Sequence, residues 1–154
     1  MDEKKTHRQF AVDTFNHTWE LLEKSDRTKE DEVRMLHSAH ASRYHWGEVG
    51  NALNLTRGEW QISRVYSVLN RPEPALYHAQ LCLDICLENK IGDFDLAFAY
   101  EALARASAIT GNWAAAKEYI TLALKAGEQI SDADDRDYFL KDIRSIPGFD
   151  KINP

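Results

Sequence analysis

Glycine, proline and cysteine are scarce in this chain, which has 154 residues but only seven glycines, four prolines and two cysteines. So few turn-forming residues exclude a collagen or a linker-rich array and argue against an all-β fold. The eighteen alanines instead favour helices, because alanine has the highest helix propensity. Hydrophobic residues at 44% and charged residues at 29% are typical of a globular protein. The length predicts one domain.

An excess of basic charge and long apolar runs are also missing. The net charge of −6 argues against a nucleic-acid partner, which requires a basic face that displaces counterions from phosphates. The same charge disfavours binding to an anionic membrane surface. Residues 1–5 read Met-Asp-Glu-Lys-Lys, which is not a signal peptide, and no segment approaches the ~20 apolar residues of a membrane span. We therefore expect a soluble, cytoplasmic protein.

Motifs that bind cofactors or perform covalent chemistry are absent as well. The sequence contains no phosphate loop, dinucleotide fingerprint, nucleophile elbow or paired zinc-ligand cysteines, so it indicates no cofactor. Its two cysteines, Cys82 and Cys86, lie one helical turn apart in an apolar run. Side chains that leave one helix in parallel are badly aimed for a disulfide. We expect both to be buried, reduced thiols.

Apolar residues recur at helical spacing along almost the whole chain, and six polar or Gly- and Pro-containing breaks interrupt this pattern. The pattern predicts seven helices, at residues 6–24, 29–46, 51–69, 72–88, 94–110, 113–127 and 133–145. Connections of a few residues force each helix to pack antiparallel on its predecessor. The chain is therefore predicted to form a series of helical hairpins.

Two of the predicted hairpins are related by a shift of 41 residues. The shift aligns residues of similar size and polarity: Ile62 with Leu103, Ser63 with Ala104, Arg64 with Arg105, Asn70 with Gly111, Ala75 with Ala116, Cys82 with Ala123 and Leu83 with Leu124. The later copy resembles the tetratricopeptide repeat (TPR), through Leu103-Ala104, Gly111-Asn112-Trp113, Ala116, Ile120, Ala123 and Leu124. Small residues let two helices approach closely, and a glycine permits a left-handed helix end. The period exceeds the usual ~34 residues, and Asn70 stands where glycine is usual.

The resemblance implies an all-α fold, a short right-handed α-solenoid of about three antiparallel hairpins plus a C-terminal capping helix. Residues 1–154 form a single TPR-like domain in this interpretation, with a degenerate hairpin at 6–48, repeats at 51–90 and 92–130, and a cap at 132–146. Ser131 or Asp132 is expected to begin the capping helix. Its apolar side carries Tyr138, Phe139, Ile143 and Ile146.

A repeated arginine is the first candidate for a functional site. Arg64 and Arg105 occupy the same place in consecutive first helices, and the resemblance implies that this place faces a concave groove. Arg57, Trp60 and Glu101 fall on the same face in this reading. We predict a groove of mixed charge in which two guanidinium groups favour a carboxylate and Trp60 anchors the partner. The alternative is that the arginines only form salt bridges with neighbouring acids.

A histidine cluster is the second candidate. His37, His40 and His45 lie within nine residues of one predicted helix. Reflection about the first turn brings His17 level with His37 and Asp13 level with His40. These four residues, without His45, could bind zinc or another transition metal through neutral imidazoles. The alternative is that the histidines pack and hydrogen-bond locally.

The sequence thus favours a non-enzymatic module that binds a protein or peptide, with acidic or carboxylate groups as the preferred chemistry and neither nucleic acid nor membrane as partner. The alternative is a small metal- or ligand-binding protein, or an enzyme, with its site around His17, His37 and His40. A homodimer is also compatible with the sequence. Trp19, Trp46 and Trp113 are predicted to pack in the core or between hairpins.

Overall fold

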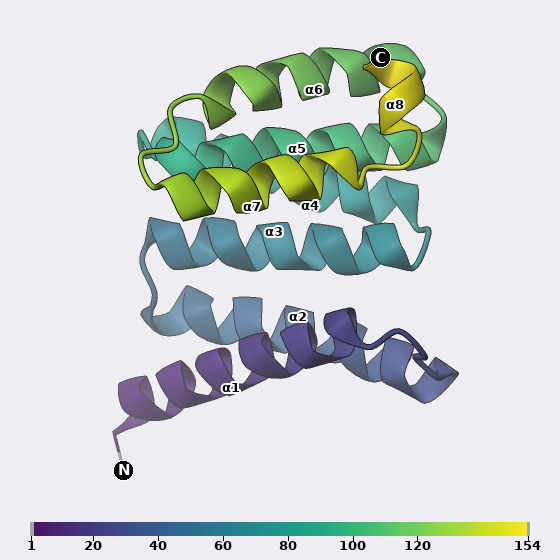
Figure 1. Ribbon diagram of the computed structural model, residues 1–154. Helices are drawn as coiled ribbons and strands as arrows, with labels where there is room; N and C mark the ends of the chain where they lie inside the picture. Colours follow the sequence, from purple (N-terminus) through teal and green to yellow (C-terminus); the bar gives the residue numbers. More distant parts are fainter. Residues whose placement is uncertain (1, 154) are drawn as a thin grey trace.

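The computed structural model describes residues 2–153, in which eight α-helices and no strand are present (Figure 1). The helices are α1 (Glu3–Glu23), α2 (Lys29–Val49), α3 (Ala52–Val68), α4 (Pro72–Glu88), α5 (Asp93–Thr110), α6 (Trp113–Gly127), α7 (Ala133–Arg144) and α8 (Phe149–Ile152). The all-α prediction is confirmed, and the seven predicted helices begin and end within three residues of the predicted bounds. The short α8 was not predicted.

Local residue chemistry explains where the helices begin and end. Thr28 and Asp31 form a capping box at the start of α2, in which each side chain accepts the backbone N–H of the other. Asn70 and Gly111, aligned by the 41-residue shift, follow α3 and α5 with φ of 56° and 84°. Asparagine tolerates this left-handed conformation better than most residues. Asn70 therefore takes the place that glycine has in the later copy.

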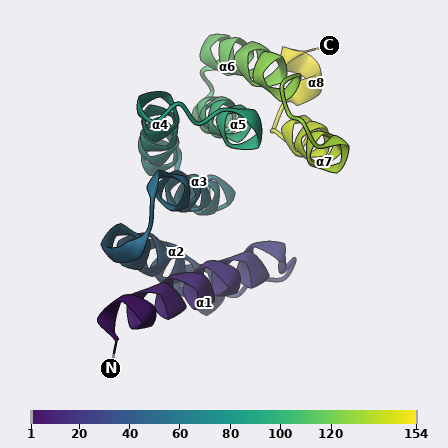
Figure 2. The same cartoon turned by 90° about the vertical axis from the view of Figure 1, so that its left-hand side faces the viewer.

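Each helix from α2 to α7 packs against its predecessor along the chain (Figure 1). Figure 2 shows α1, α3, α5 and α7 along one side and α2 and α4 along the other, with α6 outside α5. The helices α3 and α5 pack directly on each other, as do α5 and α7. Between α1 and α3, Gln61 donates a hydrogen bond to the carbonyl oxygen of Phe15 (3.0 Å). The odd-numbered helices thus form one continuous face.

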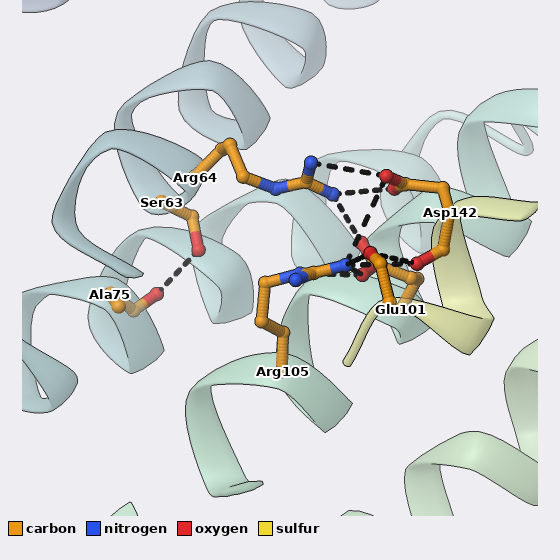
Figure 3. Close-up of polar contacts among 7 residues, drawn as sticks. Ser63, Arg64, Ala75, Glu101, Arg105 and Asp142 are labelled. Atoms are coloured by element: carbon orange, nitrogen blue, oxygen red, sulfur yellow. Dashed lines mark hydrogen bonds and ion pairs between the residues drawn. The ribbon is translucent and has the colours of Figure 1, made fainter. Parts of the chain in front are cut away.

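Small residues set the spacing of the hairpins. Ala104, Ala116 and Ala123, the residues predicted to permit close approach, have no exposed surface. Between α3 and α4, Ser63 donates a hydrogen bond to the carbonyl oxygen of Ala75 (2.7 Å, Figure 3). Such a contact requires the two backbones to lie close together. The alanine content thus serves packing as well as helix propensity.

The C-terminal helices cover the end of the stack. Phe139, Ile143 and Ile146 are buried as predicted, whereas Tyr138 is half exposed. Gly127 lies so close to α7 that a Cβ atom would sit 2.5 Å from the Phe139 ring. Among residues 2–153, no helix combines the length and the apolar character needed to cross a bilayer.

Trp113 differs from its predicted packing role, since 52% of its surface is exposed. Its ring lies against the backbone of Gly148, where a Cβ atom would approach it to 3.0 Å. The indole therefore covers the turn that begins α8 rather than filling the space inside the α5–α6 hairpin. The repeat pattern did not reveal this because α8 lies outside it.

Candidate functional site

A cavity of about 200 Å³ lies on the face formed by the odd-numbered helices. Six of its ten lining residues are aromatic, and they come from four helices: Phe15 and Trp19 from α1, Trp60 from α3, Phe94 and Phe98 from α5, and Tyr138 from α7. Aromatic side chains bury large areas and favour apolar or aromatic ligand groups. We call this cavity the aromatic pocket.

The aromatic rings contact one another across the helices. Trp19 and Trp60 have ring centroids 5.6 Å apart, and Trp60 meets Phe98 edge to face at 5.8 Å. Phe98 then lies 5.9 Å from Tyr138. These separations are typical of favourable aromatic pairs. The wall of the pocket is therefore continuous from α1 to α7.

Helical spacing explains how the pocket is built. Residues four apart lie one above the other on a helix face. The lining residues follow this rule in three helices: Phe15 and Trp19, Thr56 and Trp60, Phe94 and Phe98. This spacing of aromatic residues was visible in the sequence, but we read the tryptophans other than Trp60 as core. The prediction holds for the buried Trp46, whereas Trp19 is half-buried and lines the pocket.

One wall of the pocket carries an ion pair. Arg57 donates two hydrogen bonds to Asp95, from Nε to Oδ1 (2.9 Å) and from Nη2 to Oδ2 (3.2 Å). The hydrogen bond to Asp95 raises the pKa of Arg57 despite partial burial, and the charges of Asp95 and Asp135 add to this. This bidentate pair joins α3 to α5 and already supplies Arg57 with a carboxylate.

A buried ion network lies next to the pocket (Figure 3). Glu101 has no exposed surface and accepts hydrogen bonds from Arg64 Nη2 (3.2 Å) and Arg105 Nε (2.8 Å). Asp142 of α7 accepts hydrogen bonds from both terminal nitrogens of Arg64. Two cations are thus matched by two carboxylates, as buried charges require.

The network attaches α7 to α3 and α5. Arg105 Nη2 also donates to the carbonyl oxygen of Asp142 (3.0 Å) and to Ser145 Oγ (2.8 Å). Burial alone would lower the pKa of Arg64, but the charges and hydrogen bonds of Glu101 and Asp142 outweigh it and raise the pKa. The Arg64 guanidinium lies 4.9 Å from the Trp60 ring centroid, in cation–π geometry. The ion network therefore supports one wall of the pocket.

The five residues predicted to line a groove take two different positions. Arg57 and Trp60 line the aromatic pocket, whereas Arg64, Glu101 and Arg105 belong to the ion network. The side chains of Arg64 and Arg105 are only 13% and 11% exposed, and both are paired with carboxylates of this chain. The reason is α7, which brings Asp142 onto this face. A partner's carboxylate would have to displace these internal pairs.

The predicted metal ligands of the first hairpin make separate contacts. His17 Nδ1 lies 3.4 Å from Glu20, and Asp13 accepts a hydrogen bond from Gln9 (2.8 Å). Both contacts stay within α1. Within residues 2–153, no three His, Cys, Asp or Glu side chains are placed to hold a metal ion together. The structure therefore does not assemble the predicted set of His17, His37, His40 and Asp13.

His40 instead belongs to a polar cluster between α2, α3 and α4. Its Nε2 lies 2.9 Å from the Tyr66 hydroxyl, and the Tyr66 ring stacks on His78. Glu59 bridges His78 Nδ1 (2.6 Å) and Arg43 Nε (2.9 Å). Burial lowers the pKa of His40, and the neighbouring His78 lowers it further. These contacts join three helices, so the hydrogen bond of His40 is a tertiary contact rather than a local one.

The two cysteines are free and buried, and Cys82 lies at the pocket. Thr56 Oγ1 lies 3.1 Å from Cys82 Sγ and 3.3 Å from Cys86 Sγ. The hydrogen bond with Cys86, followed by burial, raises the pKa of Cys82. Cys82 therefore contributes a neutral thiol to the lining of the pocket.

Comparison of the chain with models of protein families, with curated proteins and with solved structures finds no match. The site itself has to indicate the function. The pocket offers aromatic surface, a neutral thiol and an ion pair already neutralised within the chain. Trp60 lines the pocket, and its Nε1 is buried without a hydrogen-bond partner among residues 2–153. The aromatic surface is the feature of this pocket that is suited to binding, because it favours apolar or aromatic groups.

Proposed function

We propose that this chain is a non-enzymatic module that binds a protein or peptide on the face of its odd-numbered helices. In this proposal the fold is a short, right-handed, TPR-like α-solenoid of three hairpins, and α7 is its cap. The support comes from the 41-residue correspondence, the shared left-handed residues Asn70 and Gly111, and the direct packing of α3 on α5. In repeat proteins such a face is the usual binding surface.

The observation that carries the proposal is the aromatic pocket shared by four helices. Its volume of about 200 Å³ is smaller than the ~300–1,000 Å³ typical of sites that enclose a whole small molecule. A single bulky side chain of a partner is therefore the better occupant. Burial of one such apolar side chain contributes about 1.5–3 kcal/mol.

The mechanism is display of a preformed surface. The Arg57–Asp95 pair joins α3 to α5, and the ion network joins both helices to α7. Because these contacts fix the walls before the partner arrives, binding orders few side chains and loses little entropy. Trp60, at the centre of the chain of aromatic rings, is the expected hot spot.

The test is selection of binding peptides from a random library displayed on phage, with the purified full chain as bait. Trp60→Ala should weaken the selected peptides about 30-fold or more, the effect of removing a hot-spot tryptophan. Trp113→Ala is the matched control, because Trp113 is exposed on α6 and does not line the pocket. Circular dichroism verifies that both variants are folded. Equal binding to wild type and Trp60→Ala, or the absence of any selected binder, contradicts the proposal.

A further inference from the structure

The charges around the aromatic pocket indicate the chemistry of its partner. Three arginines lie on this face, and each is paired with a carboxylate of the chain: Arg57 with Asp95, Arg64 with Asp142 and Arg105 with Glu101. These six groups sum to zero charge. The sign of the remaining charge at the pocket therefore depends on other residues.

Two carboxylates flank the pocket without such a partner. Glu23 lies one helical turn beyond Trp19 on α1, and Asp135 lies three residues before Tyr138 on α7, so each shares its helix face with a pocket residue. Both are exposed, and neither forms an ion pair among residues 2–153. Burial is the main cause that raises the pKa of Tyr138, and the negative charges of Asp142, Glu101 and Glu23 raise it further. The charge of Glu23 therefore acts at the pocket. The negative charge of Asp135 likewise contributes to the raised pKa of Arg57, which lines the pocket.

The surface available to a partner extends beyond the aromatic pocket. A second cavity of about 180 Å³ adjoins it and shares Phe15 and Arg57 as lining residues. Val12 contributes further apolar surface there, and the largely buried Trp46, with Arg8 over its ring at 5.3 Å, forms part of the wall. Two adjoining cavities between α1 and α3 fit successive side chains of a peptide better than one isolated group.

We propose that the partner is a peptide segment in which a bulky apolar side chain enters the aromatic pocket and flanking lysine or arginine side chains pair with Glu23 and Asp135. This inference rests on the proposed function and adds the sign of the partner's charge. The two aligned arginines suggested an acidic partner, whereas this inference assigns a basic one. The reason is that Glu101 and Asp142 already neutralise Arg64 and Arg105. Complementary charges of this kind accelerate association and select among partners.

Three synthetic pentapeptides, acetylated and amidated, test the inference on the ¹⁵N-labelled full chain: Gly-Lys-Phe-Lys-Gly, Gly-Glu-Phe-Glu-Gly and Gly-Lys-Ala-Lys-Gly. The readout is the shift of the indole N–H signals of Trp19 and Trp60, with Trp113 as the remote reference. The Lys-Phe-Lys peptide should move the two pocket signals and bind about 4–25-fold more tightly than Glu-Phe-Glu at low salt, because two exposed ion pairs contribute roughly two- to fivefold each. This preference should shrink at high salt.

Substitution of the two flanking carboxylates tests whether they cause the preference for the basic peptide. The double variant Glu23→Gln/Asp135→Asn should bind the two Phe peptides with affinities within about twofold of each other, because both flanking charges are gone. The matched control is Glu118→Gln/Glu128→Gln, which makes the same change of charge at exposed residues outside the pocket. The control should keep the preference of the wild type. An equal loss of preference in both variants overturns the pairing with Glu23 and Asp135.

The failures of the two proposals are distinguishable. If Glu-Phe-Glu moves the Trp19 and Trp60 signals at equal or lower concentration than Lys-Phe-Lys, the basic partner is wrong while the apolar anchor pocket stands. If Lys-Ala-Lys binds as well as Lys-Phe-Lys, or if neither Phe peptide moves these signals, the anchor pocket itself is refuted and both proposals fall.

Discussion

Replacement of Glu101 by glutamine is the sharpest test of the buried ion network, because the two side chains have nearly the same shape. Glu101 is fully buried and accepts hydrogen bonds from Arg64 and Arg105 through different oxygens. A glutamine side chain keeps one acceptor oxygen and has an NH₂ group in place of the other. That NH₂ group would face a guanidinium, which donates hydrogen bonds but accepts none. The variant therefore loses a charged hydrogen bond and leaves two arginines with Asp142 as their only counter-charge.

The expected loss of unfolding free energy is about 3–5 kcal/mol, the range for breaking a buried ion pair by removal of one partner. For a chain of this length, such a loss lowers the melting temperature by roughly 6–20 °C. Urea denaturation followed by circular dichroism measures the free energy, and a thermal scan measures the melting temperature. Glu118→Gln, an exposed control, should stay within about 0.5 kcal/mol of wild type.

A second substitution separates charge from shape. Arg105→Met in the Glu101→Gln background removes the cation that has lost its counter-charge and should recover part of the lost stability. The two changes are then strongly non-additive. A loss below about 1 kcal/mol for Glu101→Gln, or additive effects in the double variant, would refute the reasoning that Glu101 balances both guanidinium groups.

Three further predictions concern helix ends and close packing. The hydrogen bond from Lys24, followed by that from the Thr28 backbone, lowers the pKa of Asp31 to about 2. The stabilising effect of the Asp31 carboxylate is therefore fully present above its unfolded pKa of 3.8 and disappears as the pH falls through about 2. Urea titrations over this pH range should show that the unfolding free energy of Asp31→Asn depends less on pH than that of the wild type. Gly111→Ala should lose about 1–2 kcal/mol in urea denaturation because of its positive φ, and an unchanged midpoint would contradict this. Gly127→Ala should lower the melting temperature, because the new Cβ meets Phe139 at 2.5 Å; equal melting temperatures would contradict it.

The helices were predictable because their signals are local. Apolar spacing, the polar cluster before α2 and the prolines that begin α4 fix seven helices within three residues of their observed ends. The four-residue α8 was not predictable from such signals, since it is too short to show a period. Its position follows from packing of Ile152 into the core and of Gly148 against Trp113.

The candidate site was less predictable because it depends on contacts between distant residues. Arg57 and Trp60 both line the aromatic pocket, but Asp95 and Asp142, which pair with Arg57 and Arg64, are 38 and 78 residues away from their partners. Sequence spacing within a helix cannot reveal such pairs. The aromatic spacing at Phe15 and Trp19 was informative, and helical periodicity alone does not distinguish a pocket from a core.

The position of α7 explains why two arginines that the 41-residue shift aligns, Arg64 and Arg105, differ in their surroundings. Arg64 pairs closely with the Asp142 carboxylate and covers Trp60, whereas Arg105 donates to the Asp142 carbonyl oxygen and lies 3.9 Å from its carboxylate. A helix that only shielded apolar surface would need no such pairing. Because Asp142 neutralises positive charge on the face of the odd-numbered helices, the aromatic rings are the main attraction for the proposed partner. Removal of that carboxylate in Asp142→Asn should therefore shift the proposed preference of the pocket from basic towards acidic peptides, because Arg64 and Arg105 then carry one more positive charge than their carboxylates balance.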